Sequence, residues 1–174
     1  MNLKCAICGE EHDVADFAWH FREPLPWLLA SDAERAHSAM TEEQCELVTH
    51  EGMHLFIHAL LHIPIKGSDE VFTWGVWCSL SEKSYSEVSD NWENSERVGL
   101  GPYFGWLCSK IPEYPDTMYL KTHVHQREVG LRPTVELEQT MHPLAIHQRE
   151  GIERAELSRI VSVLFHDYEK QNRG

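Results

Sequence analysis

Two neighbouring stretches of alternating apolar residues constrain the fold of this chain more than any other sequence feature. Every second residue is apolar from Met53 to Ile63, and the same pattern recurs over residues 71–80. A period of two is that of a β-strand, whose successive side chains point to opposite faces. Gly75 lies within the second stretch and predicts a bulge or a close approach of another segment. The two stretches therefore predict long strands within one sheet.

Helices are expected before and after these strands. A short helix is predicted over residues 27–33, and Ser81 is a residue type that favours the start of a second one. A further short helix is predicted over residues 103–111, directly after a Gly-Pro pair. Residues 152–170 form the clearest helical pattern, with apolar residues along one stripe.

The remaining pattern predicts a hairpin. Two strand-like runs, residues 117–126 and 133–139, are separated by a segment that contains Gly130. Together the elements predict an α+β fold, with a mainly antiparallel sheet, peripheral helices and an N-terminal segment that resembles a zinc knuckle.

Length and composition predict one globular domain. The chain has 174 residues, 42% of them hydrophobic, and neither an internal repeat nor a polar linker divides it. We therefore expect a single domain over residues 1–174, in which a metal-knuckle segment (1–23) precedes an α+β body (24–174). The odd number of cysteines, five, argues against a disulfide framework.

The charge balance narrows the range of partners. There are 28 Asp and Glu residues against 15 Lys and Arg, which gives a net charge of −13. A surface that binds nucleic acid requires the opposite balance. The chain has neither an apolar stretch long enough to span a bilayer nor a recognisable secretion signal, so we expect a soluble, cytoplasmic protein.

A zinc site is predicted near the N-terminus. Cys5 and Cys8 form a Cys-x-x-Cys turn, and Gly9 directly after it gives the backbone the freedom that a metal knuckle needs. His12 is close enough to be a third ligand, and Cys45 is the candidate for the fourth. Such a closed site would be structural; a redox pair and unligated thiols are the alternatives.

A second metal motif reads His-Glu-Gly-Met-His. On a helix, His50 and His54 would bind one zinc ion and Glu51 would activate a water molecule for hydrolysis. However, Gly52 is unfavourable inside a helix, and the segment 53–63 that follows alternates as a strand. The favoured interpretation is a turn that leads into a central strand, and the zinc-dependent hydrolase is the alternative.

Other polar side chains have a functional and a structural interpretation. Lys121, His123 and His125 share one strand face, near Arg127 and Arg132, where they would bind an anion or remain an ordinary solvated surface.

Histidine and aromatic side chains allow the same two kinds of interpretation. His142, constrained by the proline that follows it, is a candidate general base or a structural hydrogen-bonding residue. A set of aromatic residues near glycines would line a ligand groove or pack in the core: Trp74, Trp77, Phe104 and Trp106.

Several segments in order resemble one bacterial family. These are GSDEVFTWGVWCSLSEKSY, GPYFGWL, YPDTMYLKTHVH, RPTVELE and HPLAIHQREGI, between residues 67 and 152. The chain resembles the bacterial family named domain of unknown function 2199. The N-terminal pattern of that family is also matched, by Cys5, Cys8, His12 and Cys45. The resemblance implies a strand over residues 53–63. Members usually lack the histidines that stand here at positions 50, 58 and 62, and the family carries no activity to transfer.

The sequence as a whole predicts a zinc-stabilised, non-enzymatic binding or interaction domain of the bacterial cytoplasm. Its acidic surface favours a basic protein partner, such as a toxin nuclease, because opposite charge accelerates association.

Overall fold

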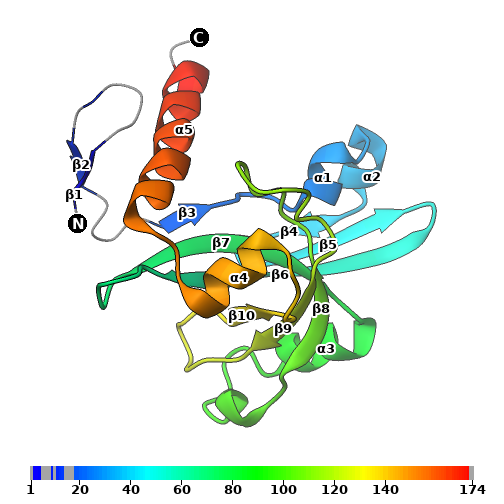
Figure 1. Ribbon diagram of the computed structural model, residues 1–174. Coiled ribbons are helices and arrows are strands. Elements are labelled where there is room, and N and C mark those ends of the chain that lie inside the picture. The colour runs from blue at the N-terminus through cyan, green and yellow to red at the C-terminus, as the bar shows by residue number, and fades with distance from the viewer. Residues whose placement is uncertain (1, 5–8, 10, 14–17, 173–174) are drawn as a thin grey trace.

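The computed structural model describes residues 2–4, 9, 11–13 and 18–172. At its centre, five strands form a closed ring, which is a small mixed β-barrel (Figure 1). Neighbours in the ring are antiparallel, except where β10 closes the ring by running parallel to β6 through the pair Thr134–Leu60. The five strands are β6 (Gly52–Pro64), β7 (Val71–Leu80), β8 (Tyr103–Leu107), β9 (Lys121–His125) and β10 (Thr134–Leu137).

Three more strands extend the sheet beyond the ring. β3 (Ala18–His20) runs parallel to β7, β5 (Gln44–Thr49) runs antiparallel to β6, and β4 (Ala39–Met40) lies beside β5. β3 falls within residues 1–23, so the main sheet begins before residue 24. A separate two-stranded sheet contains β1 (Asn2–Lys4) and β2 (Glu11–Asp13).

Helices pack around the sheet. None of those described is long and apolar enough to cross a membrane. Helix α5 (Arg154–Asn172) confirms the strongest helical pattern of the sequence. Helix α3 (Glu82–Asp90) confirms the helix expected after Ser81, and the Ser84 amide in its first turn donates a hydrogen bond to the Ser81 hydroxyl. The helices are α1 (Leu25–Leu29), α2 (Asp32–Ala36), α3 (Glu82–Asp90), a 3₁₀ turn (Arg97–Gly99), α4 (Pro143–Glu150) and α5 (Arg154–Asn172).

The helix predicted over residues 27–33 is instead two short helices. Ser31 begins α2 because its hydroxyl accepts from the Glu34 amide, while the Glu34 carboxylate accepts from the Ser31 amide at 2.8 Å. This reciprocal cap fixes the start of α2 and turns the chain after α1.

Both predicted central strands are confirmed, and both of their faces are buried. One face of β6 and β7 fills the barrel with residues such as Ile57, Leu61 and Val76, joined by apolar residues of α5. The opposite face carries a second apolar cluster made of Cys45, Leu47, Phe56, Trp77 and Cys108. Burial on both faces explains why the two stretches contain so few charged residues.

The helix predicted over residues 103–111 is wrong, because this segment forms β8. Its residues alternate, with Tyr103 and Leu107 buried and Phe104 exposed, as a strand of the barrel wall requires. Gly105 allows β7 to approach, since a Cβ atom there would lie 2.3 Å from the Ser79 carbonyl oxygen. The hairpin predicted around Gly130 is confirmed by the antiparallel pairing of β9 and β10.

Helix α4 completes the hydrogen bonding of β10. The Gln148 side chain accepts from the Leu137 amide at 2.8 Å and donates to the Val135 carbonyl at 2.7 Å. It replaces a neighbouring strand along the part of β10 that β6 does not reach.

Gln148→Leu is expected to lower the free energy of unfolding by about 2 kcal/mol, because two backbone groups in a buried strand lose their partners. Urea denaturation measures this change, with Gln139→Leu as the control at an exposed position. Equal stabilities for Gln148→Leu and the wild type would contradict the role of this amide.

Candidate functional site

The predicted zinc ligands are only partly described by the structure. Cys5 and Cys8 lie outside the described residues, and His12 is described only as backbone of β2. Cys45 is completely buried on β5, in the apolar cluster with Phe56 and Trp77. Burial raises the pKa of the Cys45 thiol to about 12. Because Cys5 and Cys8 lie outside the described residues, the zinc site at Cys5, Cys8, His12 and Cys45 stays a prediction.

The His-Glu-Gly-Met-His segment is a β-hairpin. Thr49 pairs with Gly52, so His50 and Glu51 form the turn, and His54 lies on β6. The helix required by the hydrolase alternative does not form, which corrects that interpretation; Gly52 has a φ of +129° that suits the hairpin. Among the residues that the structure describes, no three His, Cys, Asp or Glu side chains are placed to hold a metal ion.

The hairpin turn instead borders an exposed groove. Two cavities, of about 640 and 340 Å³, share the side chains of Pro26, Leu29 and Tyr119. We call the two together the α1 groove. Its apolar wall consists of Leu25, Pro26, Leu29, Met118 and Tyr119, and its carboxylates are Glu34, Glu51 and Asp116.

Local structure explains why the groove is apolar and open. Pro24 and Pro26 open helix α1, in which Trp27 packs toward the second apolar cluster while Leu29 is 77% exposed. Tyr119, which comes shortly before β9, is 63% exposed and has a φ of +61°. A non-glycine residue in this left-handed region is strained by about 1–3 kcal/mol, and such strain is most frequent at functional sites.

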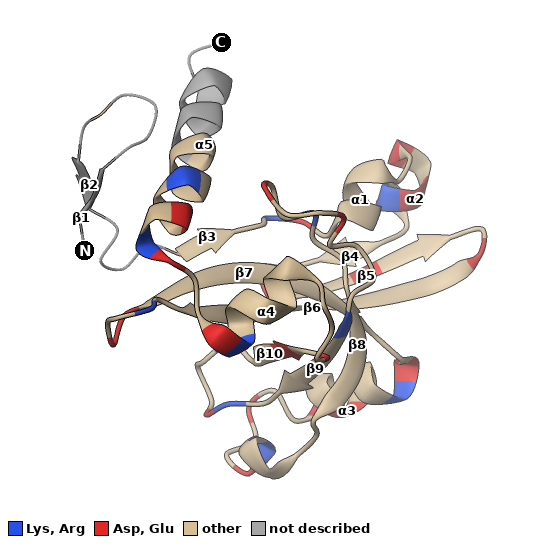
Figure 2. Ribbon diagram, in the orientation of Figure 1, with Lys and Arg blue, Asp and Glu red and all other residues tan. Residues whose placement is uncertain are grey.

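The charged end of the groove is acidic. The His50 ring nitrogens lie 4.0 Å from a carboxylate oxygen of Glu34 and 4.0 Å from one of Glu51. Figure 2 shows acidic residues on α2 and at the β5–β6 turn, on the same side of the molecule. Of the residues that line the groove, only Lys110 is a lysine or arginine.

A second site, which sequence reasoning missed, surrounds His58 on β6. The His58 side chain is 3% exposed and stacks on Trp77, with the ring centroids 4.8 Å apart. Its Nδ1 lies 3.0 Å from the Glu42 carbonyl oxygen, which can only accept, so this nitrogen carries the proton. Burial, followed by the nearby charge of Arg132, lowers the pKa of His58 to about 4. His58 is therefore an uncharged imidazole at neutral pH.

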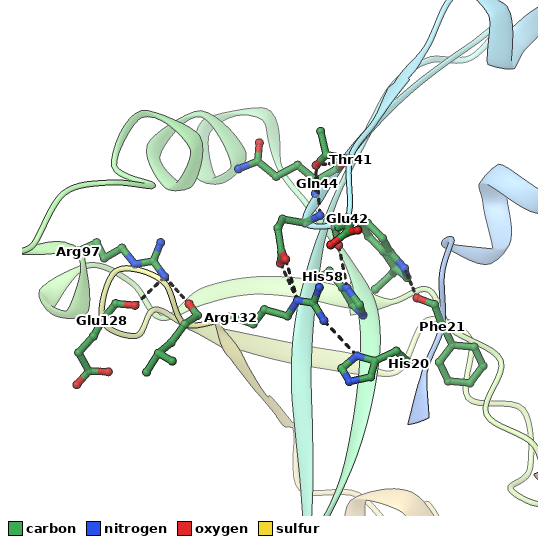
Figure 3. A network of polar contacts seen from close by, with 12 residues as sticks. His20, Phe21, Thr41, Glu42, Gln44, His58, Arg97, Glu128 and Arg132 are labelled. Atoms are coloured by element: carbon green, nitrogen blue, oxygen red, sulfur yellow. Dashed lines mark hydrogen bonds and ion pairs between the residues drawn. The ribbon is translucent and has the colours of Figure 1, made fainter. Parts of the chain in front are cut away.

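Arg132, whose charge acts on His58, joins two other segments of the chain (Figure 3). Its Nε donates to both carboxylate oxygens of Glu43, at 2.9 and 2.8 Å, and its Nη1 donates to Nδ1 of His20 at 3.2 Å. His20 belongs to β3 and lies against Gly75, where a Cβ atom would be 2.0 Å from the His20 ring. The close approach predicted at Gly75 is thus confirmed. Burial and then Arg132 lower the pKa of His20 as well.

Arg97 fixes the loop that leads to Arg132. It is 1% exposed and donates hydrogen bonds to the carbonyl oxygens of Trp92, Arg127, Glu128 and Leu131. Its guanidinium carbon also lies 4.8 Å from the centroid of the Trp92 ring. The turn between β9 and β10 is therefore held from inside, and Arg132 follows it directly.

The predicted basic strand face is balanced by acidic neighbours. Lys121 and His123 each lie 3.7 Å from Glu138, and His125 lies 3.4 Å from Glu136. These pairs favour the solvated-surface interpretation over an anion site.

The other predicted clusters separate. Trp74 lies inside the barrel and Trp77 on the opposite face, whereas Phe104 and Trp106 point outward. The predicted aromatic groove is therefore absent from the described residues. His142 has a structural role, since its Nδ1 accepts from the Leu144 amide at 3.1 Å at the start of α4.

Comparison with known proteins agrees with the resemblance inferred from the sequence. Residues 4–152 match the family described as "Uncharacterized protein conserved in bacteria (DUF2199)". No curated protein and no solved structure matches the chain. The match extends from the Cys-x-x-Cys segment to the residues that precede α5, and the chain therefore belongs to the DUF2199 family of bacterial proteins.

Proposed function

We propose that this chain is a non-enzymatic binding domain that holds a basic, amphipathic segment of a protein partner in the α1 groove. One observation carries the proposal: an exposed apolar wall, formed by Leu29 and Tyr119, lies next to the carboxylates Glu34 and Glu51. A segment with an apolar face and cationic side chains matches both parts.

The apolar wall supplies binding free energy. Leu29 and Tyr119 expose most of their surface, and burying a leucine side chain completely contributes about 1.5–3 kcal/mol. Aromatic and large apolar side chains at the centre of an interface are the residues that most often dominate affinity.

The carboxylates supply orientation and speed. Glu34 and Glu51 flank His50 at the hairpin turn, and their carboxylates can pair with cationic side chains of the partner. The net charge of −13 also attracts a basic protein over a longer range, and this attraction falls as salt is added.

A fluorescein-labelled helical peptide with one leucine face and one lysine face is the probe for this groove. Leu29→Ser and the pair Glu34→Gln with Glu51→Gln are each expected to weaken its binding about tenfold, measured by fluorescence anisotropy. Glutamine at position 34 keeps the helix cap, so α2 remains folded.

Matched control variants distinguish peptide binding in the α1 groove from attraction to the negative charge of the protein as a whole. Met141→Ser removes an equally exposed apolar side chain, and Glu93→Gln with Glu96→Gln removes the same charge elsewhere. These variants are expected to bind within about twofold of the wild type. Equal losses in the groove and control variants would contradict the proposal.

We further propose that zinc at Cys5, Cys8 and His12 stabilises the N-terminal segment. Metal analysis of the purified protein is expected to find zinc that Cys5→Ser and Cys8→Ser lose. Cys45→Ala should keep the metal, because its side chain packs with Phe56 and Trp77. His54→Ala should keep it too, since His54 contacts Thr49 instead. A wild-type protein without zinc would remove this part of the proposal.

A further inference from the structure

A cavity of about 630 Å³ opens beside Arg132 and shares no lining residue with the α1 groove. It lies between β3, the turn that connects β4 to β5, and the start of β10. The residues that decide its chemistry are His20, Phe21, Arg22, Met40, Glu42 and Arg132.

Arg132 presents unused donors at this cavity. A guanidinium group has five N–H bonds, and Arg132 uses Nε toward Glu43 and one Nη1 proton toward His20. Within the described part of the chain, Nη2 has no hydrogen-bond partner, and the side chain is 26% exposed. Because Glu43 holds the Nε side, the outer Nη edge keeps a fixed orientation toward the cavity.

His20 adds a donor of the same kind. Its Nδ1 accepts from Arg132, so in the neutral ring Nε2 carries the proton. Arg22 also lines the cavity and supplies a second guanidinium group. These donors suit an oxyanion, and the planar edge of an arginine suits a carboxylate in particular.

Two further features limit the ligand. Glu23 and Glu42 line the same cavity, so their carboxylates disfavour a ligand with two negative charges. Phe21 and Met40 offer apolar surface for the rest of the molecule. Buried His58 also borders the cavity.

We infer that this cavity is a binding site for a small monocarboxylate with an apolar body, whose carboxylate pairs with the outer edge of Arg132 and with His20. The site is separate from the α1 groove, so it does not depend on the proposed capture of a basic segment.

Benzoate is the probe, and isothermal titration of the full chain measures its binding. Saturable binding to one site is expected, and inorganic phosphate should bind more weakly because much of it is dianionic at neutral pH. Arg132→Lys keeps the charge but loses the planar edge, and should weaken benzoate binding about tenfold or more. Arg154→Lys, at an exposed arginine paired with Glu70, should change nothing.

The variant Gly75→Ala tests the site without a substitution of Arg132 itself. The added methyl group would displace the His20 ring, so weaker benzoate binding is expected even if Arg132→Lys fails to fold. No saturable benzoate binding, tighter phosphate binding, or unchanged affinity in both variants would overturn the inference. Leu29→Ser should bind benzoate normally, which distinguishes failure here from failure of the proposed α1 groove.

Discussion

Arg97→Met is expected to lower the free energy of unfolding by about 3–5 kcal/mol. Arg97 is buried, and within the described part of the chain its hydrogen bonds go to backbone carbonyl oxygens and none to a carboxylate. Methionine fills a similar volume but has no hydrogen-bond donor. The backbone carbonyl oxygens that would lose their donor are those of Trp92, Arg127, Glu128 and Leu131. The loop between β9 and β10 would then open.

Urea denaturation followed by circular dichroism measures this change. Arg97→Lys should recover part of the stability, because an ammonium group has three donors but not the spread of a guanidinium group. Arg127→Met is the control, since Arg127 contributes its backbone carbonyl rather than its side chain to this network. A loss below about 1 kcal/mol in Arg97→Met would contradict the account of the loop.

Acidification is expected to remove about 3 kcal/mol of stability through His58 alone. The pKa of this imidazole is 6.5 in the unfolded chain and about 4 in the folded protein. Between these values the unfolded state binds the proton and the folded state does not. Stability from this group is therefore complete above pH 6.5 and is lost as the pH falls to about 4. The charged and titratable groups around His58 are His20, Glu42, Glu43 and Arg132.

The comparison of wild type with His58→Phe isolates this contribution. Phenylalanine can stack on Trp77 but cannot ionise, so the variant should lose less stability between pH 7 and pH 4 than the wild type. His37→Phe, at an exposed position, should follow the wild type. Parallel stability curves for wild type and His58→Phe would show that His58 does not carry the predicted protonation.

Local periodicity predicted much of the fold. The two central strands and α5 follow from spacings that lie within each segment. β8 was mistaken for a helix because a Gly-Pro pair before it resembles a helix start, and its alternation covers only five residues. Closure of the barrel depends on the contact of Leu60 with Thr134, for which no local pattern exists.

The candidate sites depended still more on distant contacts. Arg132 meets Glu43 and His20 across separations of 89 and 112 residues, so the sequence grouped it only with its strand neighbours. Leu29 falls within the short helix predicted over residues 27–33, and the sequence did not indicate that its side chain would be exposed. Cys45 was assigned to zinc because no aromatic residue stands beside it in the sequence, and its packing with Trp77 from another strand has no local pattern.

The central claim is that the α1 groove, and not the acidic surface in general, recognises a basic amphipathic segment. The most direct test is a titration of ¹⁵N-labelled protein with the leucine–lysine peptide, followed by the shifts of backbone amide resonances. The account predicts the largest shifts over residues 25–36, 49–54 and 116–119, which border the groove. Shifts centred on α3, or spread evenly over all acidic segments, would contradict it.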